Sequence, residues 1–260
     1  MDLIVGREKA LLIDTGYGFG DLKGTVSSLT SLPLIVVNTH GHLDHACGNA
    51  QFNQPVYIHP LDMDLCREHN GHLRRSLALD YARHCPQPDG GETDILTGEF
   101  DDTSYLRLGA GDLTPTTEGD VFDLGGAHLR VIEVPGHTAG SIGLLHEERN
   151  LFFAGDAFNP AVWLFLPEAL SLEQYAATLR KAIACSFDGL VFSHVSNIMN
   201  PEALRDYLDL AEHLEYESGI PFSAPLVPGA TARLCIRKGY SPEDTGKKGF
   251  ASIVINKDHF

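Results

Sequence analysis

The sequence predicts an α/β fold in which two β-sheets pack face to face and helices cover the outside. Short apolar stretches recur along the chain, and several of them end just before a histidine or an aspartate. The two halves of the chain also repeat one order, namely strands, a helix, and a strand that ends in polar residues. With 260 residues, of which 43% are hydrophobic and 21% charged, we expect one globular domain over residues 1–260.

The first half begins with two strands that a tight turn joins. Asp21 is a suitable N-cap for a helix that Pro33 prevents from continuing. The wholly apolar, β-branched run Leu34–Val37 is typical of a strand that is buried on both faces. The expected elements are strands at 3–5, 10–13, 34–37 and 56–58 and helices at about 21–32 and 45–52.

Residues 60–118 differ in character from the segments around them. The stretch Leu61–Cys85 has a helical pattern of leucines among charged residues. From Pro86 to Gly98 the chain is rich in proline, glycine, aspartate and threonine. Because connections of this length are more often functional or mobile than filler, we expect a partly helical excursion that forms a lid or a wall over the site.

The second half alternates strand and helix patterns. Ser171 is a suitable N-cap for the first of its helices, and Glu173 favours the first turn. The expected elements are strands at 121–124, 127–134, 141–146, 151–154 and 189–193, helices at 172–185 and 201–218, and a C-terminal β-hairpin at about 230–256.

The segment that follows the strand at 34–37 concentrates metal-binding residue types, with His40, His42, Asp44 and His45 close together. Histidine and aspartate are costly to bury together unless a cation pairs with them, and both are good ligands for zinc or iron. In extended chain, residues two apart point to the same side, so His40 and His42 can approach one ion together. The alternative is a solvated polar loop that contains several histidines.

Three later strand ends carry further candidate ligands. His137 lies in the glycine-rich segment after the strand that ends at Val134, Asp156 follows the strand at 151–154, and His194 follows the strand at 189–193. Each residue taken alone is more simply explained as a polar turn residue. Their occurrence at successive strand ends is what favours a metal site.

This set of residues resembles the metallo-β-lactamase-fold superfamily of metallohydrolases. The matching motifs are His-x-His-x-Asp-His at 40–45, Pro-Gly-His-Thr-x-Gly-Ser at 135–141, Gly-Asp at 155–156, and His194, so the resemblance extends from about residue 3 to residue 194. It implies an αββα sandwich with the site at one edge between the sheets. It also implies two zinc ions, with iron or manganese as alternatives. The first ion would be held by His40, His42 and His137, the second by Asp44, His45 and His194, and Asp156 would bridge the two.

The resemblance implies a hydrolase in which a hydroxide shared by two zinc ions attacks a small ester, thioester, lactone or phosphoester. Asp44 would be the catalytic carboxylate that orients the water and moves its proton. An aspartate at position 156, where the zinc β-lactamases have cysteine, argues against antibiotic hydrolysis. Asp14 and Thr39 are expected to fix the imidazole tautomers, although Asp14 could instead cap backbone amides. The alternative functions are a mononuclear iron persulfide dioxygenase of the same fold and a non-catalytic, metal-stabilised binding protein.

Candidate substrate contacts come from two regions. Phe158, Trp163 and Phe165 lie in an aromatic-rich loop after Asp156 and could grip an apolar acyl or aryl group, with ordinary core packing as the alternative. A carboxylate or a phosphate could be met by His72 together with residues in or near the excursion, namely His59, His69, Arg74 and Arg75. A solvated helix face explains these polar residues more simply.

Composition narrows the range of partners. The formal charge is −16, and a field of that sign repels nucleic acid. Five widely spaced cysteines without a Cys-x-x-Cys motif argue against disulfides and a zinc ribbon. No apolar run reaches the length of a membrane span, and the first residues do not resemble a signal peptide. We therefore expect a cytoplasmic protein with a small-molecule substrate, no nucleic-acid or membrane partner, and a homodimer as an open option.

Overall fold

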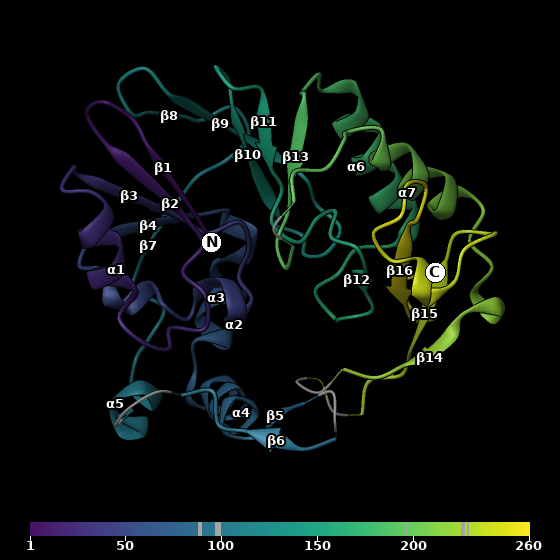
Figure 1. The fold of residues 1–260 in the computed structure, drawn as a ribbon, viewed down its shortest axis with the longest axis horizontal. Coiled ribbons are helices and arrows are strands. Elements are labelled where there is room, and N and C mark those ends of the chain that lie inside the picture. Colours follow the sequence, from purple (N-terminus) through teal and green to yellow (C-terminus); the bar gives the residue numbers. More distant parts are fainter. Residues whose placement is uncertain (88–89, 97–99, 196, 225–226, 228) are drawn as a thin grey trace. The chain divides into compact units, whose positions relative to one another are not determined.

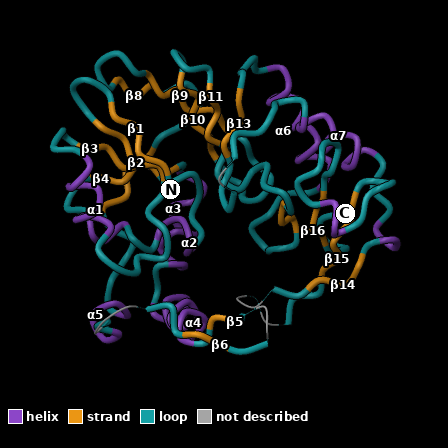
Figure 2. Tube along the Cα trace, viewed as in Figure 1, coloured by secondary structure: helices purple, strands orange, loops and turns teal. Residues whose placement is uncertain are grey.

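The computed structural model describes residues 1–87, 90–96, 100–195, 197–224, 227 and 229–260. Contacts within the chain divide it into two compact units. Unit 1 comprises Met1–Thr116 and Asp123–Gly126, and unit 2 comprises Thr117–Phe122 and Ala127–Phe260. Figure 2 shows that both units contain strands as well as helices. Part of the predicted turn-rich stretch at 86–98 lies outside the described residues.

Unit 1 is built on a five-stranded mixed sheet with the order β1-β2-β3-β4-β7. The first pair is antiparallel and the remaining neighbours are parallel. Parallel strands present their carboxyl ends at one edge, where α/β sheets usually bind ligands. The strands are β1 (Asp2–Val5), β2 (Ala10–Ile13), β3 (Leu34–Val37), β4 (Pro55–Ile58) and β7 (Asp112–Pro115).

The helices of unit 1 follow these strands in sequence. Asp21 caps the first of them as predicted, because its side chain accepts a hydrogen bond from the amide of Gly24 at 2.7 Å. The α-helices are α1 (Leu22–Leu29), α2 (Leu43–Ala46), α3 (Met63–His69), α4 (His72–Arg83) and α5 (Asp102–Leu106), and the 3-10 helices are η1 (Asn49–Gln51) and η2 (Pro60–Asp62).

The predicted excursion at 60–118 is only partly separate from the core. Residues 112–115 form β7, which extends the main sheet by pairing with β4. Between β4 and β7 the chain forms η2, α3, α4, a two-stranded ribbon of β5 (Cys85–Pro86) and β6 (Glu92–Thr93), and α5. The sequence missed β7 because its polar and proline residues give a weak strand pattern.

A buried arginine ties this region to the rest of unit 1. Arg75 of α4 is 0% exposed, and its guanidinium donates hydrogen bonds to the backbone oxygens of Asn70 and Cys47 and to the side-chain oxygen of Asn70. It also lies over the ring of Tyr105 at 4.8 Å from the centroid. The prediction that Arg75 lies on a solvated helix face or meets an anionic ligand is wrong, because backbone carbonyls and an amide bind it.

Unit 2 contains two sheets. One has the order β13-β11-β10-β9-β8 and the other β12-β16-β15-β14, the latter including the predicted C-terminal hairpin as the antiparallel pair β15 and β16. Figure 1 shows β9, β10, β11 and β13 running side by side. The strands are β8 (Val121–Asp123), β9 (His128–Glu133), β10 (Ile142–His146), β11 (Leu151–Phe153), β12 (Val162–Leu164), β13 (Gly189–Val191), β14 (Ile220–Phe222), β15 (Ala232–Ile236) and β16 (Ser252–Ile255).

Two helices pack together in unit 2, α6 (Leu172–Ala184) and α7 (Ala203–Glu212), as Figure 1 shows. The helix α6 begins where the sequence predicts, since the Ser171 hydroxyl and the Gln174 side chain form a reciprocal capping box. Its buried face, with Tyr175 and Leu179, joins the main hydrophobic core of the unit. Within the described residues, no helix is both long and apolar enough to cross a bilayer.

Candidate metal centre

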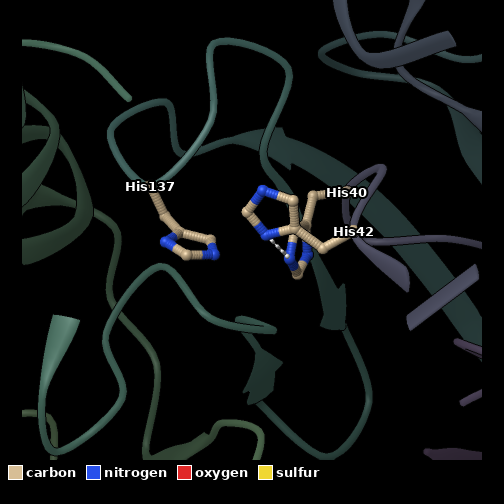
Figure 3. Close-up of side chains that lie close together, drawn as sticks. All are labelled: His40, His42 and His137. Atoms are coloured by element: carbon tan, nitrogen blue, oxygen red, sulfur yellow. Dashed lines mark hydrogen bonds between the residues drawn. The ribbon is translucent and has the colours of Figure 1, made fainter. Parts of the chain in front are cut away.

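The loop after β3 brings two imidazoles together. His40 and His42 are both buried, and the His40 Nε2 atom lies 3.1 Å from the His42 Nδ1 atom. Figure 3 shows these two rings with the contact between them dashed, and it also draws His137 of unit 2. The expectation that residues two apart would turn to the same side is confirmed for this pair.

Hydrogen bonds to Asp14 orient the imidazole of His45 directly and that of His40 through Thr39. Its carboxylate accepts hydrogen bonds from the Thr39 amide at 2.7 Å, from the Thr39 hydroxyl at 2.9 Å and from His45 Nδ1 at 2.8 Å. Since the Thr39 hydroxyl donates to Asp14, it accepts from His40 Nδ1, which is 3.1 Å away. Both rings therefore keep Nε2 as the lone-pair nitrogen, and the predicted contacts of Asp14 and Thr39 with the histidines are confirmed.

Helix α2 supplies the next two predicted ligands. The His45 Nε2 atom lies 3.5 Å from the Asp44 Oδ2 atom. His45 is buried, whereas the side chain of Asp44 is 22% exposed. The pair thus presents one nitrogen and one carboxylate oxygen toward each other, with the carboxylate reaching solvent.

Unit 2 holds a second cluster of predicted ligands. The Asp156 Oδ2 atom lies 3.1 Å from His194 Nε2 and 3.9 Å from His137 Nε2. The His137 Nδ1 atom donates to the carbonyl oxygen of Trp163 at 2.9 Å, because a carbonyl can only accept. His137 therefore also keeps Nε2 as its lone-pair nitrogen, and the carboxylate of Asp156 lies between two imidazoles.

Backbone strain marks both clusters. Asp14 and His194 have φ angles of 60° and 67°, and Asn150 is the other non-glycine residue with a positive φ in the described part of the chain. Such conformations cost about 1–3 kcal/mol and concentrate at functional sites. Histidine and aspartate side chains form clusters that are consistent with a metal site.

Close contacts explain why residue 41, between the two histidines, is a glycine. A Cβ atom at Gly41 would lie 2.8 Å from the backbone nitrogen of Cys66 and 2.9 Å from the backbone oxygen of Asp62. The Gly41 amide donates to the Asp62 carboxylate at 2.8 Å. The His-x-His loop therefore fits against η2 and α3 only when the middle residue has no side chain.

A Gly41→Ala variant tests this close fit. Because backbone atoms of another segment occupy the space, we expect a loss of about 1–3 kcal/mol of unfolding free energy and weaker metal binding. Gly109→Ala is the matched control, since no atom lies within 4 Å of the place that its Cβ would take and its φ is ordinary. Urea unfolding and metal titration of both variants measure the effect, and equal behaviour of the two would contradict the steric argument.

The two cysteines nearest the His-x-His loop are not thiolates. Burial raises the pKa of the Cys47 thiol to about 11 and that of the Cys66 thiol to about 12. Both stay protonated near neutral pH, so neither offers the charged sulfur that zinc prefers. The donors of the centre are nitrogen and oxygen atoms.

The predicted substrate contacts fall in different environments. Phe158 is fully buried in the core of unit 2, and Phe165 is buried in a smaller cluster. Trp163 is half-buried on β12, a strand where the sequence predicted a loop, and its ring lies 5.1 Å from that of Phe165. His72 is exposed at the start of α4. Contacts of these residues with a substrate stay a prediction.

Two polar residues that the sequence did not assign to the metal centre contact its His-x-His loop or the residue that follows it. Asp62 and His69 are both buried, and with Cys66 they follow the i, i+4, i+7 spacing of one helix face. That spacing distinguishes them from the solvated residues of the same segment, such as Arg67 and Glu68. A search of the sequence for polar residues that share one helix face with a residue such as Cys66 would have found them.

Comparison with known proteins gives one family. Residues 3–194 match the family model described as the Metallo-beta-lactamase superfamily. Over 231 residues the chain is 27% identical to proteins from Bos taurus and Homo sapiens, each named acyl-coenzyme A thioesterase MBLAC2. Each match covers 84% of this chain and 79% of the relative.

Solved structures agree on the fold. The structure of a metallo-beta-lactamase from Pontibacter korlensis is similar with a TM-score of 0.55 and 20% identity, and the match covers 81% of this chain and 85% of that one. The predicted fold class of mixed β-sheets with flanking helices is therefore confirmed.

Proposed function

The chain belongs to the metallo-β-lactamase superfamily, and from this premise we propose that it is a metal-dependent hydrolase that cleaves thioesters. In this proposal His40, His42 and His137 would hold one divalent ion, and Asp44, His45 and His194 would hold a second. Asp156 would contribute its carboxylate to both. The chemistry of this donor set, nitrogen and carboxylate oxygen, suits zinc, iron or manganese.

The observation that carries the proposal is the spacing of the nitrogens of His40 and His42. Two nitrogens bound to one tetrahedral zinc at about 2.0–2.1 Å each are separated by about 3.3 Å. The His40 Nε2 and His42 Nδ1 atoms are 3.1 Å apart, and the Nδ1 atom of His40 is engaged by Thr39. The loop therefore holds both nitrogens at a separation that suits one ion, which would replace the proton shared between them.

The residues around the ions have separate tasks. Bound divalent ions supply a hydroxide near neutral pH and polarise the carbonyl oxygen of the substrate. Asp44 orients the attacking water and accepts its proton, a role that its partial exposure allows. Asp14 keeps His45 in the tautomer that leaves Nε2 available, and the Trp163 carbonyl does the same for His137.

The relatives support thioesters among the ester-type substrates. The bovine and human proteins are named for acyl-coenzyme A hydrolysis, and the matches cover most of this chain. Because a thioester has a good leaving group, its hydrolysis needs no general acid beyond the metal centre and Asp44. We therefore place acyl thioesters first, ahead of lactones, oxygen esters and phosphoesters.

The test is a hydrolysis assay with purified protein. We expect release of free thiol from acyl-coenzyme A, loss of this activity after chelation, and recovery with zinc. Because the net charge of −16 repels an anionic carrier, salt should raise kcat/KM for acyl-coenzyme A more than for an uncharged acyl thioester.

Two results would overturn the proposal. A metal-loaded protein that hydrolyses lactones or phosphodiesters but no thioester would exclude this substrate class. A protein that contains one iron per chain and takes up oxygen with a persulfide substrate would exclude hydrolysis altogether.

A further inference from the structure

His69, the last residue of α3, contacts the loop that carries the proposed ligands. Its ring is buried and stacks on the ring of His42, with centroids 4.9 Å apart and planes 25° from parallel. Its Nδ1 atom accepts a hydrogen bond from the backbone amide of Leu43 at 3.2 Å. Both contacts lie within unit 1 and involve residues next to each other in the chain.

The hydrogen bond from the Leu43 amide to His69 gives a partner to an amide at the N-terminus of α2. Leu43 is the first residue of α2, and the N-cap residue His42 makes no side-chain cap bond among the described residues. The first amides of a helix have no partner within the helix, and leaving one buried and unsatisfied is costly. His69 of α3 therefore caps the N-terminus of α2, a role that the N-cap side chain usually has.

The same hydrogen bond determines which nitrogen of the His69 ring carries the proton. A backbone amide only donates, so His69 Nδ1 must be the lone-pair nitrogen, and the proton of the neutral ring is on Nε2. The backbone at the end of α3 is held as well, because the Cys47 thiol donates to the backbone oxygen of His69 and the side-chain amide of Asn70 donates to the backbone oxygen of Ala46, each at 3.4 Å. The end of α3 is thus attached to both ends of α2.

We propose that His69 is a positioning residue of the metal centre, which it serves in two ways. Its ring supports one face of His42, and its Nδ1 atom anchors the start of the helix that carries Asp44 and His45. This inference rests on the proposed function, since it assigns His69 a role toward those ligands. Groups that orient metal ligands in this way typically change metal affinity or activity about 10- to 100-fold when replaced.

A series of three variants separates the two contacts. His69→Asn retains an acceptor near the Nδ1 position but removes the ring, His69→Phe retains the ring but removes the acceptor, and His69→Ala removes both. His84→Asn is the matched control, because His84 is an exposed histidine at the end of the next helix and is paired with Asp80. Thermal unfolding of the metal-free proteins shows which variants remain folded.

Cobalt(II) titration with visible absorption reads both affinity and ligand geometry. We expect His69→Ala to bind cobalt about 10- to 100-fold more weakly with an altered spectrum. His69→Asn and His69→Phe should each recover part of the loss, and His84→Asn should match the wild type. In the metal-free wild type, long-range proton–nitrogen NMR should show His69 Nδ1 as the unprotonated nitrogen.

The outcomes distinguish this inference from the proposed function. If the wild type binds cobalt but every folded His69 variant keeps its affinity and spectrum, the inference is wrong and the proposed function stands. A protonated Nδ1 in the folded wild type would equally contradict the inference. If the wild type itself binds no metal, the proposed function fails, and the role of His69 toward ligands fails with it.

Discussion

An Asp44→Ala variant is expected to lose thioester hydrolysis by at least about 10²- to 10⁴-fold, the usual contribution of a positioned acid or base. The change removes the carboxylate that orients the water, and it also removes a ligand of the second ion, so metal content should fall from two ions toward one. Steady-state kinetics and elemental analysis of the same preparation measure both effects. Because Asp44 is partly exposed, the variant should fold normally.

Asp64→Ala is the control for this result. Asp64 is an exposed carboxylate of α3 that pairs with Arg67, and its removal should leave turnover and metal content unchanged. An Asp44→Ala protein with wild-type turnover would refute the assignment of Asp44 as the catalytic carboxylate, and unchanged metal content would refute its role as a ligand.

The second large effect is on stability. Arg75→Met should lower the unfolding free energy by about 3–5 kcal/mol, because it leaves the backbone oxygens of Asn70 and Cys47 and the Asn70 side chain without their buried donor. Stability of folded proteins is about 5–15 kcal/mol in total, so a loss of this size is a large part of it. Urea unfolding monitored by circular dichroism measures the change.

Arg74→Met provides the comparison on the same helix. Arg74 is more exposed and pairs with Glu68, an interaction worth less than about 1 kcal/mol. A loss for Arg75→Met no larger than that for Arg74→Met would mean that the buried guanidinium contributes little to holding α4 against the rest of unit 1.

Periodicity and turn chemistry predicted the regular elements well. The strand at 34–37 and the helix that starts after Ser171 begin where the sequence indicates, since an apolar β-branched run and a capping pair are local features. β7, β12 and β14 were missed because pairing with a neighbouring strand, rather than a pattern of its own, defines each of them.

Some polar side chains could also be placed from the sequence, and others could not. His40 and His42 could be placed side by side because two residues of extended chain bring side chains to one face. Arg75 was not separable from Arg74 in the sequence, since identical residue types at adjacent helical positions point to different faces. Which of these faces is buried depends on what packs against the helix.

By itself, the sequence determined the family and the types of donor atom at the candidate centre, because short spacings and strand-end positions specify both. The tertiary structure decided how those donors are held. Asp14 reaches His45 and Thr39 across 31 and 25 residues of sequence, and His69 reaches Leu43 across 26. Such contacts select tautomers and cap helices through the geometry of packed segments, which no local pattern encodes.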